Sequence, residues 1–421
     1  MSRIVLGVAG GIAAYKSCLL LRKFSEHGHD VTVVPTENAL KFVGTATWEA
    51  LSGKPVSTNA WERTWEVPHV SLGGQAELIV VAPATADLLA RAASGRADDL
   101  LSNVLLTASC PIVLAPAMHS QMWLNPATQF NVELLRERGI VVMDPAVGRL
   151  TGPDSGPGRM PEPDDIAALA LSVLQSQSVA TTLADRDYAG LRVLVSAGGT
   201  HEAIDPVRFL GNASSGKMGL ALARAARQRG AEVKLVGANL SLPAPAGVEL
   251  VPVVSTGDLA QAMLESASAA DVVIMAAAPA DFTPVAPSAQ KLKKAGGSGL
   301  TLELKQTVDA LAALVTRSND GQVVVGFAAE TAPDSAELLA LGRAKLARKG
   351  CQLLVLNDVS AGQVFGADDN SVLIITADDA EPVAAQGSKD VVAHAILDAV
   401  NHYHREYGRR ADSESRGGDS L

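Results

Sequence analysis

The 421-residue sequence has few aromatic residues and few cysteines. Phe, Trp and Tyr together make up 4% of the chain, and the three cysteines, Cys18, Cys110 and Cys351, lie far apart. This spacing excludes a recognisable Cys-x-x-Cys metal motif and a dense disulfide framework. Hydrophobic residues still account for 48% of the chain, so sizeable cores of Ala, Val and Leu are expected. Such sparse cysteine usage is typical of a cytoplasmic protein.

The chain also lacks a long apolar segment and an excess of positive charge. No apolar run approaches the ~20 residues that a helix needs to cross a bilayer. The start, Met1-Ser2-Arg3 before a strand-like run, does not resemble a signal peptide. The net charge of −10 argues against a nucleic-acid surface, which requires clustered cations. Basic clusters at 291–294 and 343–349 instead suggest a small polyanionic ligand.

Short continuous apolar runs alternate with helical patterns along the whole chain. Strands are expected at 4–9, 31–34, 78–82, 112–115 and 140–143, and again at 191–196, 232–236, 249–253, 271–277, 322–328, 352–356 and 372–376. Runs without polar alternation indicate parallel strands that helices cover on both faces. The sequence therefore predicts an α/β protein with two Rossmann-like, three-layer domains.

A polar segment separates the two halves. We expect a first domain over 1–175, a linker over 176–190 rich in Gln, Ser and Thr, and a second domain over 191–404. Residues 405–421 have almost no apolar content and are expected to form a disordered tail.

Glycine-rich turns follow the first strand of each half. Gly10 and Gly11 follow the first apolar run, and Gly198 and Gly199 follow the run at 191–196. Such turns let phosphate oxygens approach backbone N–H groups at the positive end of a helix. A glycine pair also occurs where it serves packing alone, so the motif by itself is weak. With both turns present, the sequence predicts two phosphorylated ligands.

Two further strands of the first half end in Ala-Pro-Ala, at 82–84 and 115–117. Because ligands of open α/β sheets collect at the carboxyl ends of strands, both turns should line one crevice. Together with Met118, Met122-Trp123 and Gly10-Gly11, they resemble the flavin-dependent cysteine decarboxylases.

That resemblance implies a flavodoxin-like domain that uses FMN to remove the cysteinyl carboxylate of 4′-phospho-N-pantothenoylcysteine. It places the flavin and its phosphate around Gly10, Gly11, Ser17, Thr36, Ala84 and Thr85. It also implies that Met118 and Met122 contact substrate and that His69, in a strand or turn before the first Ala-Pro segment, assists thiol deprotonation.

The first half departs from this family at two positions. His119 stands where relatives have an asparagine that can donate hydrogen bonds to the substrate carboxylate. Ahead of Asp154, in the glycine-rich segment 148–160, Thr151 or a neighbour replaces the cysteine that protonates the ene-thiol in many relatives. We expect decarboxylation to persist, with the proton supplied by water, His119 or another residue. A non-catalytic flavin-binding domain remains the alternative.

The second half carries a long series of motifs. Asp205-Pro-Val-Arg208 and Asn212-x-Ser-Ser-Gly-Lys-Met-Gly219 are followed by 276–282, 291–294, 326–331, Lys345, Lys349 and 357–360. The series is similar to the phosphopantothenate–cysteine ligases. These enzymes activate the carboxylate of 4′-phosphopantothenate with CTP, release pyrophosphate, and let the amine of L-cysteine attack the acyl-cytidylate.

The ligase resemblance implies a set of binding residues. CTP is expected at Asp281, Lys291, Phe327, Lys345 and Lys349, and the other substrates at Ser214, Ser215 and Lys217. Asn212 should hold the acyl-cytidylate, although a helix N-cap would equally explain an asparagine there. The triphosphate implies Mg²⁺, for which no protein ligand can be named.

Together the two resemblances imply a bacterial bifunctional enzyme of coenzyme A biosynthesis. They also imply a homo-oligomer with trimeric decarboxylase contacts and dimeric ligase contacts, plausibly a dodecamer. A Rossmann oxidoreductase that uses NAD(P) is the alternative, and it would need an acidic residue after the second strand to bind ribose. Glu37 is a loose candidate in the first half, whereas the second half offers only Asn239.

Overall fold

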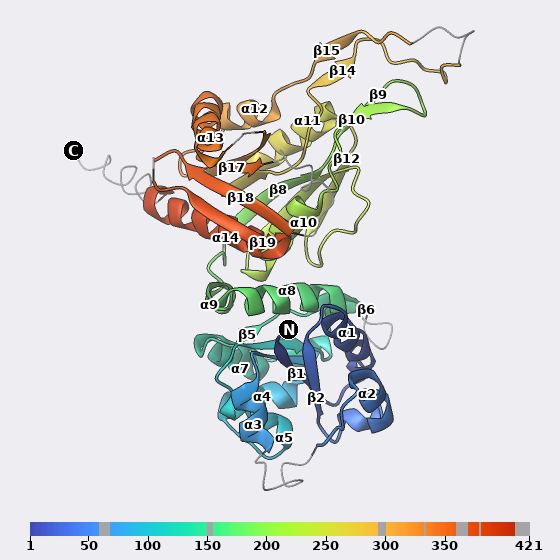
Figure 1. Cartoon of the computed structure of the whole chain (residues 1–421), viewed down its shortest axis with the longest axis vertical. Helices are drawn as coiled ribbons and strands as arrows, with labels where there is room; N and C mark the ends of the chain where they lie inside the picture. Colours follow the sequence, from blue (N-terminus) through green and yellow to red (C-terminus); the bar gives the residue numbers. More distant parts are fainter. Residues whose placement is uncertain are drawn as a thin grey trace, which may run out of the picture. The chain divides into compact units, whose positions relative to one another are not determined.

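The computed structural model describes residues 1–58, 68–149, 155–293, 300–331, 334–358, 369–378 and 380–408. The chain divides into two compact units, Met1–Asp187 and Tyr188–Leu421 (Figure 1). Each has its own sheet and its own cores. Residues 405–408 of the expected tail belong to a short π-helix, His404–Gly408. Residues 409–421 lie outside the described residues.

The first unit is built on a five-stranded parallel sheet of order β2-β1-β3-β4-β5. Its strands are β1 (Arg3–Val8), β2 (Asp30–Pro35), β3 (Leu78–Ala84), β4 (Ile112–Pro116) and β5 (Val141–Val142). Ile4 and Leu6 face one core and Val5 faces the other, so β1 is buried on both sides. This explains the continuous apolar runs in the sequence.

Helices cover both faces of this sheet. The first core contains α1 (Ala14–Glu26), α2 (Thr45–Ser52), α8 (Pro163–Gln175) and α9 (Gln177–Asp185). The second contains α3 (Pro68–Gln75), α4 (Ala86–Ser94), α5 (Leu100–Thr107), the short α6 (Ser120–Trp123) and α7 (Pro126–Glu137). A ribbon of β6 (Ala146–Arg149) and β7 (Ser155–Arg159) follows β5.

Helix α9 lies in the segment expected to be a linker. Its residues Val179 and Leu183 are buried in the core of the first unit, while Gln177, Ser178 and Thr181 are at least partly exposed. Because these exposed residues are polar, the sequence indicated a linker here and not a helix. The boundary between the units accordingly follows Asp187 and not residue 175.

The second unit contains an eight-stranded sheet of order β12-β11-β8-β13-β16-β17-β18-β19. Its strands are β8 (Arg192–Gly198), β11 (Glu232–Ala238), β12 (Glu249–Val253), β13 (Val272–Met275), β16 (Val323–Glu330), β17 (Leu353–Asp358), β18 (Asp369–Thr376) and β19 (Val383–Ser388). The strands from β12 to β17 are parallel, whereas β18 and β19 pair antiparallel. The expectation of an all-parallel sheet was therefore wrong at this edge, although the α/β fold class is confirmed.

Two layers of helices enclose the second sheet. Helices α10 (Lys217–Gln228) and α14 (Lys389–Tyr403) pack together on one face. Helices α11 (Thr256–Ala267), α12 (Ala310–Thr316) and α13 (Ser335–Lys349) cover the other. Two ribbons extend from the unit: β9 (His201–Ala203) with β10 (Phe209–Gly211), and β14 (Phe282–Pro284) with β15 (Leu304–Gln306) (Figure 1).

Candidate active sites

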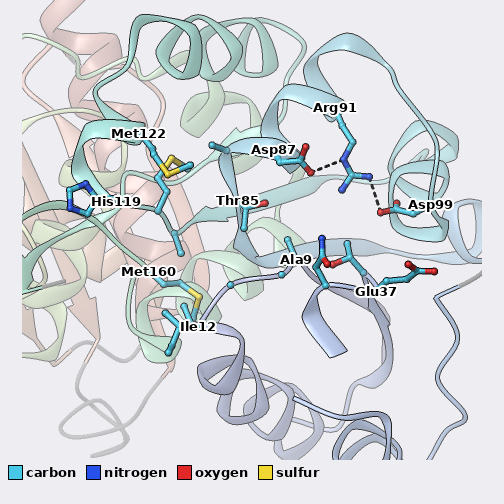
Figure 2. Close-up of a pocket in the computed structure, with 18 of the residues that line it drawn as sticks. Ala9, Ile12, Glu37, Thr85, Asp87, Arg91, Asp99, His119, Met122 and Met160 are labelled. Atoms are coloured by element: carbon cyan, nitrogen blue, oxygen red, sulfur yellow. Dashed lines mark hydrogen bonds and ion pairs between the residues drawn. The ribbon is translucent and has the colours of Figure 1, made fainter. Parts of the chain in front are cut away.

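A cavity of about 1280 Å³ opens in the first unit where β1, β2, β3 and β4 end. Of the residues expected around flavin and substrate, it is lined by Gly10, Gly11, Thr36, His69, Thr85, Met118, His119 and Met122. Ser17 and Ala84 are absent from this lining, because both are fully buried beneath it and the Ser17 hydroxyl donates to the carbonyl of Ala82. The structure thus gathers most of the expected residues at one crevice (Figure 2).

The turn after β1 packs closely against the loop after β2. A Cβ on Gly10 would lie 2.4 Å from Cβ of Asn38, so no larger residue fits without displacing the loop after β2. Helix α1 starts four residues later, its N-cap Ala13 makes no side-chain cap bond, and its first turn has no acidic residue. The positive end of α1 is therefore not neutralised by its own side chains.

His69 lies on helix α3, so its expected place in a strand or turn was wrong. The helix packs against α5, and the Thr107 hydroxyl donates to the carbonyl oxygen of His69 at 2.9 Å. The ring lines the cavity, and its Nδ1 is buried with no hydrogen-bond partner among the described residues. Because no described group fixes the proton on Nδ1 or Nε2, the neutral ring can adopt either tautomer.

His119 caps the short helix α6. Its Nδ1 accepts a hydrogen bond from the backbone N–H of Gln121 at 3.3 Å, so Nε2 carries the proton of the neutral ring. An asparagine at this position could accept with Oδ1 and donate with Nδ2. His119 therefore reproduces, with two ring nitrogens, the combination of acceptor and donor that the family asparagine offers.

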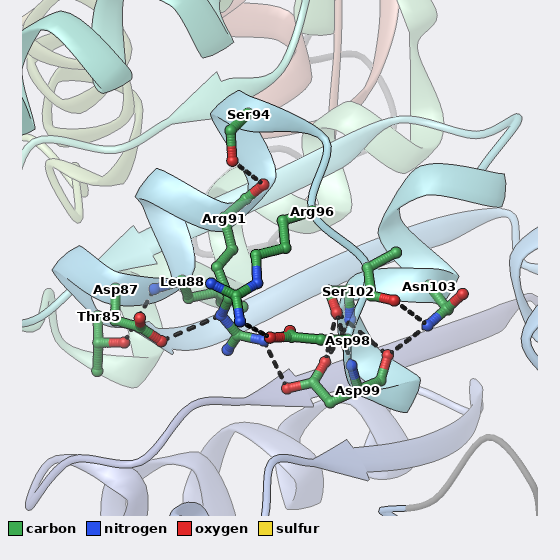
Figure 3. A network of polar contacts seen from close by, with 11 residues as sticks. Thr85, Asp87, Leu88, Arg91, Ser94, Arg96, Asp98, Asp99, Ser102 and Asn103 are labelled. Carbon is green, nitrogen blue, oxygen red and sulfur yellow. Dashed lines mark hydrogen bonds and ion pairs between the residues drawn. The ribbon is translucent and has the colours of Figure 1, made fainter.

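An arginine that the sequence analysis did not single out organises another wall of this cavity. Arg91 on α4 binds Asp87 through Nε at 3.1 Å, and its Nη1 binds Asp98 at 2.9 Å and Asp99 at 2.8 Å (Figure 3). The guanidinium lowers the pKa of Asp98. Only the i, i+4 pair with Asp87 was visible in the sequence, because the other two carboxylates lie in the turn before α5.

No cysteine within the described ranges lines either cavity. Cys110 lies in the bend before β4, and burial raises its pKa, as it does for Cys18 and Cys351. Thr151 and Asp154, which mark the departure from the family in the glycine-rich segment, lie outside the described residues.

A second cavity, of about 590 Å³, opens in the second unit where β13, β16 and β17 end. Of the expected ligand residues it is lined by Ser214, Ser215, Lys217, Asp281, Phe327, Lys345 and Lys349. Lys291 and Asn212 are not part of its lining. Gly216, with φ of 74°, is the N-cap of α10 and adopts the left-handed conformation that turns the chain into this helix.

Asn212 is not a helix cap, so that alternative was wrong. Its Nδ2 donates to the carbonyl oxygen of Pro279 at 2.9 Å, and Pro279 itself lines the cavity. The amide thus lies at the rim, where its Oδ1 and second N–H can face a ligand.

The two lysines of α13 each form an ion pair with a carboxylate. Lys345 Nζ lies 2.6 Å from Glu330 Oε1, and Lys349 pairs with Asp309. Asp309 also caps α12 by accepting from Ala312 N at 3.1 Å. Burial works against ionisation of Asp309, but Lys349, the backbone N–H of Ala312 and Arg348 together outweigh burial and lower its pKa. The lysines are therefore pre-positioned, and an incoming anion would compete with these carboxylates.

The Asp205-Pro-Val-Arg208 motif anchors the lysine-bearing segment that starts at Lys291. The Asp205 carboxylate is inaccessible to solvent and accepts from Arg208 Nε at 2.9 Å and from the backbone N–H of Leu292 at 3.1 Å. Arg208 Nη2 donates to the carbonyl oxygen of Leu292 at 2.6 Å. The Arg208 guanidinium holds the pKa of Asp205 well below its usual range. The sequence could not reveal this link, because 84 residues separate its ends.

Among the described residues, no group of three or more His, Cys, Asp or Glu side chains is placed to hold a metal ion. In the same part of the chain, no helix combines the length and apolar character needed to span a membrane.

Two family models cover nearly the whole chain: flavoprotein over residues 1–175, and DNA/pantothenate metabolism flavoprotein C-terminal domain over 188–403. The Coenzyme A biosynthesis bifunctional protein CoaBC of Mycobacterium tuberculosis is 52% identical over 404 residues, covering 94% of this chain and 96% of the relative. The protein of the same description from Bacillus subtilis is 41% identical over 412 residues, covering 97% and 98%. A crystal structure of the C-terminal domain of such a protein is 34% identical, covers 52% of this chain and 99% of its own, and has a TM-score of 0.44.

Proposed function

The chain belongs to the family of bifunctional coenzyme A biosynthesis proteins, and from that premise we propose how its two units divide the chemistry. The second unit is a phosphopantothenate–cysteine ligase, and the first is a phosphopantothenoylcysteine decarboxylase. The observation that carries this assignment is 52% identity over 94% of the chain to a bifunctional relative. Two separate cavities, one at the carboxyl edge of each sheet, support it.

In the ligase reaction, the carboxylate of 4′-phosphopantothenate attacks the α-phosphorus of CTP, and pyrophosphate leaves. The amine of cysteine then attacks the acyl carbon, and CMP leaves. Both reactants of the first step are anions, so cations must offset their repulsion. We assign this task to Lys345 and Lys349, with Lys291 on the segment anchored by Asp205, and place Mg²⁺ on the triphosphate.

The remaining ligase residues position the reactants. Phe327 and Asp281 line the same cavity and complete the nucleotide site. Ser214, Ser215 and Lys217, at the start of α10, bind the anionic groups of the other substrate. Asn212 at the rim holds the acyl-cytidylate while the amine attacks.

The residues of the first cavity fit FMN. Gly10 and Gly11 bring backbone without side chains to the cavity wall, the N-terminal end of α1 suits an anion, and the volume exceeds the ~1000 Å³ upper range of common ligand pockets. Bound FMN supplies the two-electron chemistry of the cysteinyl group. Gly10, Gly11, Thr36 and Thr85 hold it at the surface of the cavity, while Ser17 and Ala84 support that wall from below.

Side chains of this cavity then bind the substrate and transfer protons. Met118 and Met122 contact the substrate chain, and His119 donates Nε2–H to its carboxylate. His69, with Nδ1 uncommitted within the described surroundings, takes the proton of the substrate thiol. The proton for the final reduction comes from water, His119 or another residue.

Product analysis with the full-length chain tests both assignments. After removal of bound flavin, 4′-phosphopantothenate, cysteine and CTP should give 4′-phospho-N-pantothenoylcysteine, CMP and pyrophosphate. Adding FMN should release carbon dioxide and give 4′-phosphopantetheine, identified by mass. Failure to form the amide with CTP present would refute the ligase, and failure to release carbon dioxide would leave only flavin binding. Accumulated ene-thiol would show that reduction is lost.

We further propose that the chain acts in the cytoplasm as a homo-oligomer with trimeric contacts in the first unit and dimeric contacts in the second, plausibly a dodecamer. Large apolar side chains are exposed on both units, including Leu19 and Phe130 on the first and Phe209 and Phe282 on the second. Where such side chains lie together in one patch, the patch is typical of a subunit interface. Sedimentation of the full chain measures the assembly.

A further inference from the structure

The cavity of the first unit carries charge of opposite sign at its two ends. At one end, three aspartates surround Arg91, with Arg96 beside Asp98. Figure 2 shows Arg91 on one side of Thr85, and Met160, His119 and Met122 on the other. The other basic residues of the lining are Lys16, Arg149 and Arg159, and Arg159 directly precedes Met160 in the chain.

Lys16 and Arg159 share a single carboxylate. The residue Lys16 is only 8% exposed, and its Nζ lies 3.0 and 3.1 Å from the two carboxylate oxygens of Glu162. Arg159 Nη2 lies 2.5 Å from Glu162 Oε1. Glu162 stands at the N-cap of α8 but makes no cap bond, so its carboxylate is committed to the two cations. The cluster therefore has a net positive charge.

A purely structural role does not account for this cluster. Helices α1 and α8 are already joined by the Lys23–Asp164 ion pair, which lies outside the cavity. Burying a lysine side chain to 11% exposure is costly unless its ammonium is paired, and here two cations share one carboxylate. A guanidinium beside an ammonium matches the oxygens of a phosphomonoester, with Glu162 aligning both groups.

We propose that Lys16 and Arg159, with Arg149 from the neighbouring strand, form the subsite for the 4′-phosphate of the decarboxylase substrate. This inference rests on the proposed decarboxylase function. The substrate phosphate is favoured over that of FMN because Arg159 directly precedes Met160, which lies at the same end as His119 and Met122 (Figure 2). Those two residues are the ones assigned to the substrate.

The test compares two substrates on the FMN-loaded full chain. N-pantothenoylcysteine lacks only the phosphate of 4′-phospho-N-pantothenoylcysteine. Lys16→Met and Arg159→Gln should each lower kcat/KM for the phosphorylated substrate on the order of tenfold to a hundredfold, as expected for a lost charge-assisted bond. The values for the unphosphorylated substrate should change about twofold or less. Lys23→Met, a matched change on α1, should leave both substrates unaffected.

Binding measurements separate the possible sources of the phosphate. Calorimetry should show that Lys16→Met weakens 4′-phosphopantetheine but not pantetheine, without any turnover. Equal losses for both molecules would overturn the proposal, and so would a selective loss of FMN affinity relative to riboflavin. Should Lys16→Met fail to fold, Arg159→Gln carries the test, because that side chain is 45% exposed. If wild-type protein decarboxylates neither substrate, the proposed function fails while the binding comparison still decides the subsite.

Discussion

At the scale of single residues, His119 shows how one side chain can replace another of different shape. What the position requires is an acceptor for the N–H of Gln121 and a donor directed at the cavity. A neutral imidazole meets both requirements, and so does an amide. Either side chain can therefore hold the cap of α6 and present a donor to the cavity.

We therefore expect His119→Asn to retain decarboxylation within about threefold, because both hydrogen-bonding functions survive. His119→Leu should lose the cap, at a cost of ~1 kcal/mol, and lower kcat/KM by about tenfold or more. The measurement is kcat/KM for carbon dioxide release by all three proteins. A loss in His119→Asn as large as that in His119→Leu would contradict the assigned role.

The carboxylates beside the α13 lysines lead to a second prediction. CTP must compete with Glu330 for Lys345, so Glu330→Gln should bind CTP more tightly. Because partly exposed ion pairs contribute ~1 kcal/mol or less, the gain in affinity should be about two- to fivefold. Titration of CTP followed by calorimetry measures it. The control is Glu337→Gln, because Glu337 lies on the first turn of α13, the helix that carries Lys345. Weaker CTP binding in Glu330→Gln would show that Glu330 contacts the nucleotide directly.

At the scale of elements, the Asp205–Arg208 turn holds a distant segment without regular secondary structure, residues 291–293. Asp205→Asn should weaken the hold on Leu292 and release Lys291 from the vicinity of the nucleotide. We expect KM for CTP to rise on the order of tenfold, because a charged hydrogen-bond network is lost. Trypsin should also cleave faster after Lys291 and Lys293.

The control for this contact is Asp271→Asn. Asp271 accepts a hydrogen bond from the backbone N–H of Arg192, at the start of β8, at 2.7 Å. Flavin binding by the first unit should be unchanged in both variants. Unaltered cleavage and KM in Asp205→Asn would mean that the segment is held by other contacts.

Helix α14 contains a buried histidine that makes the second unit sensitive to acid. Burial, reinforced by repulsion from Arg229, lowers the pKa of His394 to about 3. An unfolded histidine titrates near ~6.5, so between roughly pH 6.5 and 3 the unfolded chain binds one more proton. The free energy of unfolding therefore falls as pH drops through this window, by about 1.4 kcal/mol per pH unit.

His394→Leu should flatten that slope, since it removes the titrating ring, whose Nδ1 has no partner among the described residues. Denaturant unfolding of the second unit at several pH values between 4 and 7 measures the difference. His402→Leu on the same helix is the control, because that ring is 78% exposed. Parallel slopes for wild type and His394→Leu would refute the coupling.

Many elements could be predicted because their residues alone determine them. Doubly buried strands such as β3 and β4 are continuous apolar runs whatever surrounds them. Helix α3 contains Gly73 and Gly74 and has little helical propensity, so it depends on packing against α5. Strand β19 is an exposed edge strand of small residues, recognisable only from its pairing with β18.

The candidate sites divide in the same way. Glycine turns and the residues after strands were predictable, because the ends of parallel strands meet at one edge. Contacts between residues distant in sequence could not be predicted. The hydrogen bonds from Leu292 to Asp205 and from Arg91 to Asp99 are such contacts. Asn212 and Lys291 belong to the recognised motifs, but in the structure they are not among the residues that line the cavity. The sequence alone did not indicate this position.

At the scale of the whole molecule, the chain consists of two units, each with a core on both faces of its own sheet. Thermal unfolding should therefore show two transitions. FMN at a hundred times its Kd should raise only the first unit's transition, by about 5–10 °C, and CTP only the second's, because ligands stabilise the part that binds them by ~2.7 kcal/mol at this excess. Fragments 1–187 and 188–421 should reproduce these shifts separately, which assigns each transition to its unit. A single transition raised by both ligands would show that the units unfold as one cooperative body.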